Sequence, residues 1–189
     1  AGIGGGAYLD GSNATLRDCR FEANSAEGSD LFGQLASFGG GLATRGPTYL
    51  TTIRQVHDCL FVGNAAGRGG SGGGIWVEDG TTAVLSNTSV VGNTAASSYT
   101  HKGAGGGVAV SASASLDMSQ GCLLEGNVAG PEDVGASDPA CLSGEGGAIY
   151  SSGSGLTLQG VILRRNRCET GALDAGCSGG AVSVTGQGP

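Results

Sequence analysis

A glycine-led motif recurs six times along the chain, and this repeat restricts the possible folds more than any other sequence feature. Runs of glycine followed by small or apolar residues start near residues 4, 39, 72, 105, 146 and 179, at intervals of 35, 33, 33, 41 and 33 residues. Such a period is typical of solenoids, in which each repeat is one coil that buries its apolar face against its neighbours. We therefore expect residues 1–189 to form a single solenoid segment, and because it starts with Ala1, to be part of a larger chain.

A second motif follows each of the first five glycine starts by 20 to 25 residues. It ends in Asn, with an apolar residue three positions earlier, and the five Asn residues are Asn24, Asn64, Asn93, Asn127 and Asn166. Equivalent positions of stacked coils lie one above another, and an Asn tolerates a left-handed turn and can hydrogen-bond along the stack. The sequence therefore predicts an Asn ladder.

Between the two motifs, apolar and polar residues alternate, as in Leu156 and Leu158. Alternation at period two indicates strands with one buried face, so each unit is predicted to contain three short strands separated by turns. The segment from each Asn to the next glycine run varies from 8 to 19 residues, which places insertions at one corner. Two core columns are expected, one containing Leu16, Val56, Leu85 and Leu158, the other Phe21, Phe61, Val90, Leu124 and Leu163.

The pairing of Gly-Gly-Ala-Ile at residues 146 to 149 with Phe-x-x-Asn at residues 21 to 24 and 61 to 64 resembles the repeats of the chlamydial polymorphic outer membrane proteins. Three repeats carry Val90, Leu124 and Leu163 in place of the Phe. The resemblance covers nearly the whole chain. It implies an all-β, pectin-lyase-like, right-handed parallel β-helix of about five to six coils with variable corner loops, and a role in adhesion at a cell surface.

The composition and net charge of the chain argue against several fold and partner classes. The chain contains 40 glycines but only 4 prolines, without a collagen-like period, which favours short strands between turns. The net charge of −7 argues against nucleic acid as a partner, because such binding begins by neutralising phosphates. The one basic run, Arg164 to Arg167, is interpreted as an exposed turn. No stretch of about 18 residues is apolar enough to span a membrane.

The glycine run Gly72 to Gly74 does not have the sequence of a phosphate-binding loop. Such a loop continues with Lys and Ser or Thr, whereas Ile75 and Trp76 follow here. These glycines are instead expected to turn a corner and to allow close backbone packing.

Six cysteines suggest an oxidising, extracellular compartment, and zinc is disfavoured because no C-x-x-C pair occurs. Cys168 and Cys177 are the preferred disulfide, in a corner loop. Cys19 and Cys59 occupy one column in adjacent coils, where either a disulfide or a stack of reduced, buried thiols is compatible with the spacing. Cys122 shares this column two coils beyond Cys59 and cannot pair with either.

Two N-glycosylation sequons begin at Asn13 and Asn87. Both fall at predicted exposed turns. We expect at least one to carry a glycan if the source secretes the protein through an endoplasmic reticulum.

Parallel β-helices include polysaccharide lyases and hydrolases, whose sites need clustered carboxylates on one face. The best such cluster is Asp18 stacked on Asp58, flanked by Arg17 and His57. The same column holds Asn87, Gly121 and Gly160 in the other coils, so turn geometry accounts for the two acids. The sequence therefore predicts no catalytic residues.

The two longest corner loops contain acidic residues that could attract calcium, namely Glu132, Asp133, Asp138, Glu145 and Asp174. They lack the alternating ligand pattern of known calcium loops, so no metal and no cofactor is expected. His101 and Lys102, in another corner loop, are predicted to be solvated.

The leading interpretation is a non-catalytic structural or adhesive β-helix segment of a larger cell-surface or appendage protein, located outside the cell. Its expected partners are other segments of that protein, neighbouring copies in an assembly, and surface glycans or proteins. Two alternatives stay open: a carbohydrate-active β-helix whose corner loops line a sugar groove, and the ligand-binding ectodomain of a membrane receptor.

Overall fold

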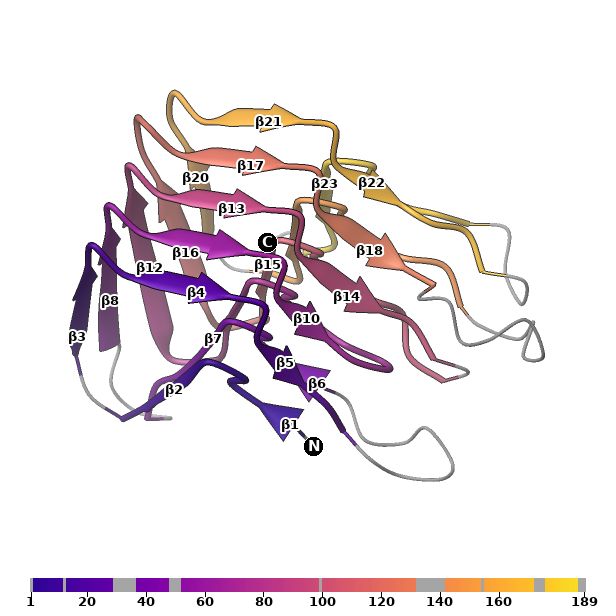
Figure 1. The fold of residues 1–189 in the computed structure, drawn as a ribbon, viewed down its shortest axis with the longest axis horizontal. Coiled ribbons are helices and arrows are strands. Elements are labelled where there is room, and N and C mark those ends of the chain that lie inside the picture. Colours follow the sequence, from indigo (N-terminus) through magenta and orange to yellow (C-terminus); the bar gives the residue numbers. More distant parts are fainter. Residues whose placement is uncertain are drawn as a thin grey trace.

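The computed structural model describes residues 2–11, 13–28, 37–47, 52–98, 100–131, 142–153, 155–171 and 176–186. Within these residues all regular elements are β-strands, and every strand pair is parallel. The chain winds upward in stacked coils, from the indigo first coil to the yellow last one (Figure 1). Each coil adds one strand to each of four long sheets, so the order of strands within a sheet follows the sequence.

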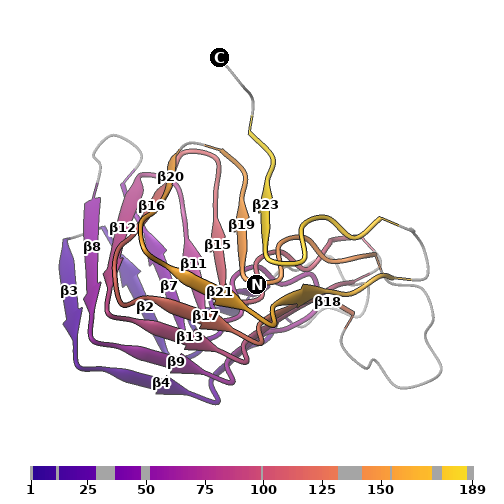
Figure 2. The same cartoon turned by 90° about the horizontal axis from the view of Figure 1, so that it is seen from above.

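The first sheet contains the glycine-led strands β2 (Ala7–Asp10), β7 (Leu42–Arg45), β11 (Ile75–Val77), β15 (Val108–Val110), β19 (Ile149–Ser151) and β23 (Val182–Val184). The second contains β3 (Ala14–Arg17), β8 (Thr52–His57), β12 (Thr81–Ser86), β16 (Ser115–Met118) and β20 (Gly155–Leu158). Together they form two adjoining walls of the coil, as the view from above shows (Figure 2).

The third sheet contains β4 (Arg20–Glu22), β9 (Leu60–Val62), β13 (Ser89–Val91), β17 (Leu123–Glu125) and β21 (Ile162–Arg164). The fourth contains β5 (Ser25–Ala26), β10 (Ala65–Ala66), β14 (Thr94–Ala96), β18 (Val128–Gly130) and β22 (Arg167–Cys168). A shorter pair, β1 (Gly2–Ile3) with β6 (Ser37–Phe38), is continued by isolated bridges through Ser71, Ala104, Glu145 and Ser178. The prediction of three strands per unit was therefore wrong. The additional strands are only two or three residues long, too short to show alternation.

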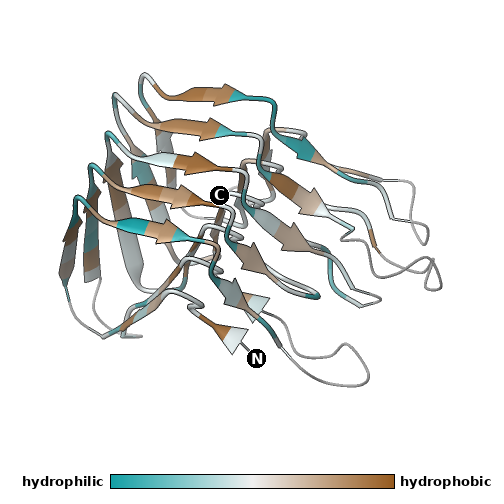
Figure 3. Cartoon of the chain, in the orientation of Figure 1, coloured by the Kyte–Doolittle hydropathy of each residue, from teal (hydrophilic) through white to brown (hydrophobic). Residues whose placement is uncertain are grey.

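The two predicted core columns are present, with one member missed and one exposed. Leu16, Val56 and Leu85 align in register, Met118 extends this column, and Leu158 ends it. Leu158 is 36% exposed because β20 is the last strand of its sheet. Apolar segments recur at equivalent places in successive coils (Figure 3).

The second column contains Phe21, Phe61, Val90, Leu124 and Leu163 in register. Phe61, Val90 and Leu124 are fully buried, and the rings of Phe21 and Phe61 stack with centroids 4.7 Å apart. Burying each such side chain stabilises the fold by about 1.5–3 kcal/mol. No single coil could bury these residues alone, so the stack as a whole forms the core.

The glycine run explains how each coil enters the first sheet. Gly72 has a φ of 66°, and a Cβ added there would lie 2.1 Å from the carbonyl oxygen of Ile75. At Gly73 an added Cβ would lie 2.3 Å from the carbonyl oxygen of Thr94. The first position needs the left-handed backbone and the second needs close approach of neighbouring backbone, as only glycine permits.

Candidate functional site

The five Asn residues form a hydrogen-bonded ladder at the corner between the third and fourth sheets. In every link, the backbone N–H and the side-chain Nδ2 of one Asn donate to the Oδ1 of the Asn in the next coil, at 2.9–3.0 Å; the series is Asn24, Asn64, Asn93, Asn127 and Asn166. The Nδ2 groups also donate to carbonyl oxygens, such as that of Phe61. The three central Asn residues are buried, so the ladder satisfies interior backbone groups and presents no free amide there.

The acidic pair singled out from the sequence lies in a second column, between the second and third sheets. Asp18, Asp58 and Asn87 have φ values of 53°, 55° and 45°, and Gly121 and Gly160 continue the column with φ values of 84° and 65°. Gly, Asn and Asp are the residues that adopt this left-handed conformation most readily. We call these five residues the left-handed turn column.

The side chains around Asp58 are engaged with one another. Asn87 Nδ2 donates to Asp58 Oδ1 at 2.7 Å, and Arg17 Nη1 lies 3.5 Å from Asp58 Oδ2. The Nδ1 of His57 lies 2.5 Å from the hydroxyl of Ser86, a contact not predicted from the sequence. Ser86 is the in-register neighbour of His57, so column alignment was the signal that could have found it.

The structure brings together Lys102, which was predicted to be solvated, and Glu145, which belongs to the acidic corner loops where no metal was expected. Lys102 Nζ donates to Glu145 Oε1 at 2.9 Å, and both side chains are at least partly covered. His101 is exposed, as predicted. Glu132, Asp133, Asp138 and Asp174 lie outside the described residues. Within the described part of the chain, His, Cys, Asp and Glu do not gather in groups of three or more that could hold a metal.

The basic run, predicted to be an exposed turn, belongs instead to the end of one strand, a single left-handed residue and the last Asn of the ladder. Arg164 belongs to β21, Arg165 has a left-handed φ of 56°, and Asn166 ends the ladder. Arg164 Nη2 and Arg165 Nη1 lie 2.7 and 3.2 Å from the two carboxylate oxygens of Glu125. The hydrogen bond from Arg164 is the main cause that lowers the pKa of Glu125 below its ordinary value.

The cysteines separate into one disulfide and a column of thiols. Cys168 and Cys177 form a disulfide, with Cα atoms 5.9 Å apart. Cys19, Cys59 and Cys122 are free, so the disulfide alternative for Cys19 and Cys59 was wrong. The thiols of Cys19 and Cys59 instead donate to the carbonyl oxygens of Arg17 and His57, at 3.2 and 3.0 Å.

Cys19 and Cys59 stay unpaired because equivalent residues of parallel, in-register coils extend their side chains in the same direction. Their sulfur atoms therefore point alongside one another and not toward one another. Burial is the main cause that raises the pKa of Cys59 and Cys122 above the ordinary thiol value. Cys141, the sixth cysteine of the chain, lies outside the described residues.

Both sequon asparagines are exposed, but their amides differ. Asn13 Oδ1 accepts a hydrogen bond from the backbone N–H of Ile53 at 2.9 Å. Asn87 uses its Nδ2, the atom to which a glycan would be attached, to bond Asp58. Asn13 is therefore better placed than Asn87 to carry an N-linked glycan.

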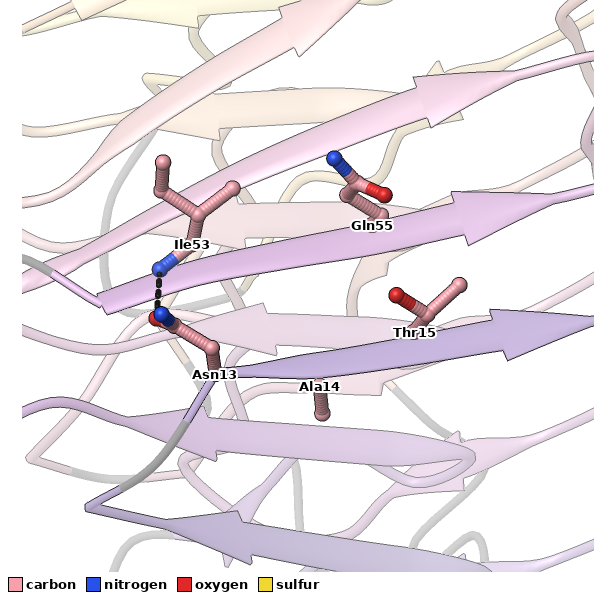
Figure 4. Close-up of a pocket in the computed structure, with 5 residues that line it drawn as sticks. All are labelled: Asn13, Ala14, Thr15, Ile53 and Gln55. Atoms are coloured by element: carbon pink, nitrogen blue, oxygen red, sulfur yellow. Dashed lines mark hydrogen bonds between the residues drawn. The ribbon is translucent and has the colours of Figure 1, made fainter.

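An open groove lies on the outer face of the second sheet. It has a volume of about 280 Å³ and is lined by Asn13, Ala14, Thr15, Ile53 and Gln55. The close-up shows the polar side chains of Thr15 and Gln55 beside one another on adjacent strands (Figure 4). Ile53, 45% exposed, supplies an apolar surface at the same place. Amide, hydroxyl and apolar groups together can contact an uncharged polar ligand.

Apart from Asn13, which was predicted as a glycosylation sequon, the groove residues were not singled out from the sequence. Thr15 and Gln55 each directly precede a predicted core residue, Leu16 and Val56. Since successive side chains of a strand point to opposite faces, the same alternation that located the core also places this pair on the outer face. Their chemistry, without a charged cluster, gave no separate signal.

The comparisons with known proteins give one family. Its model is described as a right-handed β-helix region, and it matches residues 2–163. Searches of curated proteins and of solved structures returned no significant match. Among the described residues, no helix has the length and hydrophobicity required to span a membrane.

Proposed function

Because the chain belongs to the right-handed β-helix family, we propose that it is a non-catalytic structural segment of a larger extracellular protein, with an adhesive surface on the outer face of its second sheet. The observation that best supports a non-catalytic role is the left-handed backbone of Asp18 and Asp58. Gly121 and Gly160 meet the same backbone requirement without a carboxylate. The two acids are thus explained by their turns.

The stacked architecture supports the structural part of this proposal. The Asn ladder links five successive coils through side-chain hydrogen bonds, which are buried in the two central links, and the apolar columns run through the same coils. In a solenoid built this way each inner coil is stabilised by the coils on both sides of it. Such a segment can hold a binding surface at a fixed distance from the rest of a larger protein.

The groove supports the adhesive part. Asn13, Thr15 and Gln55 present uncharged hydrogen-bonding groups, and Ile53 presents an apolar surface. Neutral glycans offer matching hydroxyl groups and apolar ring faces. A glycan attached to Asn13 itself would cover this groove, so binding is best measured on protein prepared without N-glycosylation.

The test combines binding with turnover. Neutral and acidic polysaccharides are incubated with the wild-type chain and the Asp58→Asn variant, with and without calcium, and both retention and cleavage are measured. We expect retention of neutral glycans without cleavage, weakened by Gln55→Ala and unchanged by Thr157→Ala, a matched control further along the same outer face. Cleavage that disappears in Asp58→Asn would overturn the non-catalytic proposal and favour the carbohydrate-active alternative.

The receptor-ectodomain alternative has no specific support among the described contacts. It shares the groove but requires a soluble ligand rather than a surface glycan. Absence of glycan retention, together with capture of a small ligand that Gln55→Ala abolishes, would favour it.

A further inference from the structure

One cation lies inside the apolar core. Arg54 is at the centre of β8, at the inward position that Ala14 and Ala83 occupy in the adjacent coils. Its side chain is 0% exposed, and it is the largest of the fully buried side chains. Arg54 therefore differs from every other guanidinium described above, all of which reach the surface.

The guanidinium of Arg54 is incompletely bonded. Its Nη2 donates to the backbone carbonyl oxygen of Arg45 at 3.0 Å. In the part of the chain that the structure describes, its buried Nε and Nη1 atoms have no hydrogen-bond partner. Arginine carries five N–H donors and no acceptor, so these groups can be satisfied only by an acceptor that enters the interior.

Among the described residues no acidic side chain is buried, so none accompanies the charge of Arg54 in the interior. Thr52 lies two residues before Arg54 on the same buried face of β8. Its hydroxyl lies 3.5 Å from that of Thr81 and donates to the carbonyl oxygen of Gly80. The acid that acts electrostatically on Arg54 is Asp10, which is exposed. Burial lowers the pKa of Arg54 below its ordinary value and Asp10 opposes this shift, yet a guanidinium stays protonated in proteins.

A buried, uncompensated charge is strongly unfavourable unless an opposite charge accompanies it. A water molecule could accept a hydrogen bond from Nε or Nη1, but it would leave the charge uncompensated. We propose that a small monovalent anion of the chloride class occupies the interior corner beside Arg54 and accepts hydrogen bonds from its free N–H groups. The anion must be small because the guanidinium is sealed from solvent.

This site would make the stability of the β-helix depend on halide concentration. The inference is independent of what the outer groove binds, since the groove lies on the opposite face of the same sheet. Loss of glycan binding would leave it unaffected, and loss of the anion effect would leave the adhesive proposal standing.

The first test is unfolding of the wild-type chain in chloride against gluconate at constant ionic strength. At a chloride concentration ten times its dissociation constant, the folding equilibrium constant should rise about elevenfold. Arg54→Met should abolish this dependence. Arg17→Met removes an exposed cation from the same sheet and should leave it unchanged. Equal chloride dependence in wild type and Arg54→Met, or none in wild type, would overturn the proposal.

The second test does not require the variant to fold. Wild-type crystals grown in bromide should show an anomalous scattering peak within hydrogen-bonding distance of the Arg54 guanidinium. An ordered water at that position, without anomalous signal, would show that a neutral molecule satisfies the donors, and would contradict an anion site.

Discussion

The Asn ladder and the left-handed turn column stand at opposite ends of the third sheet, and both repeat once in each of five coils. The ladder holds Asn at every level. The turn column holds Asp, Asp, Asn, Gly and Gly, with a positive φ at each. Two positions of equal periodicity thus differ in how strictly the residue type is fixed.

Burial and bonding explain this difference. The central ladder residues are buried, and each amide both donates and accepts along the stack, which neither a carboxylate nor a hydroxyl can do in the same way. The turn column is exposed and only requires a backbone conformation. In these two columns, the position that holds the same residue in all five coils meets a hydrogen-bonding requirement. The position whose residue differs between coils meets only a backbone-conformation requirement.

The largest effect is expected for Asn93→Asp, which keeps the shape of the side chain. The new oxygen would replace Nδ2 and face the oxygens of Phe61, Val91 and Asn127, which Nδ2 now contacts at 3.0–3.2 Å. An uncompensated buried charge of this kind should lower the free energy of unfolding by about 3–5 kcal/mol at neutral pH.

This loss should depend on pH. Burial among acceptors raises the pKa of the new carboxyl in the folded state above its usual value of about 3.9. The folded state then binds more protons than the unfolded state, so the destabilisation grows as pH rises from about 4 through the folded pKa. Urea unfolding at pH 4.5 and 7, with wild type in parallel, measures it. An identical loss at both pH values would contradict this account.

A smaller loss is expected for Asn64→Ala. This change removes the acceptor for Asn24 and the donor to Asn93 and to the carbonyl oxygen of Phe21. Buried groups left without partners should lower the free energy of unfolding by roughly 1–3 kcal/mol. The denaturation midpoint should fall while the slope of the urea transition stays unchanged, and a loss below about 0.5 kcal/mol would mean that the ladder contributes little.

Periodicity was sufficient to predict the all-β solenoid, the Asn ladder and most of the core, because each position is repeated several times in one chain. It was insufficient where a repeat departs from its column. Arg54 stands two residues before Val56, at the offset of Ala14 and Ala83, but a charged residue is normally assigned to the outer face. The Ser86 contact with His57 and the groove at Gln55 depend on side-chain chemistry across neighbouring coils, which no single repeat displays.

The smallest effect is expected in the turn column, where Asp58→Gly tests the comparison most directly. Glycine relieves the left-handed backbone of Asp58, while the exposed hydrogen bond from Asn87 is lost and the unfolded chain gains freedom. These contributions oppose one another, so the free energy of unfolding should change by less than about 0.5 kcal/mol. Asn64→Gly is the matched control, because the same replacement at the ladder removes buried hydrogen bonds and should cost at least as much as Asn64→Ala. If Asp58→Gly destabilised the chain as much as Asn64→Gly, conformation alone would not explain the turn column, and the carboxylate of Asp58 would require a separate role.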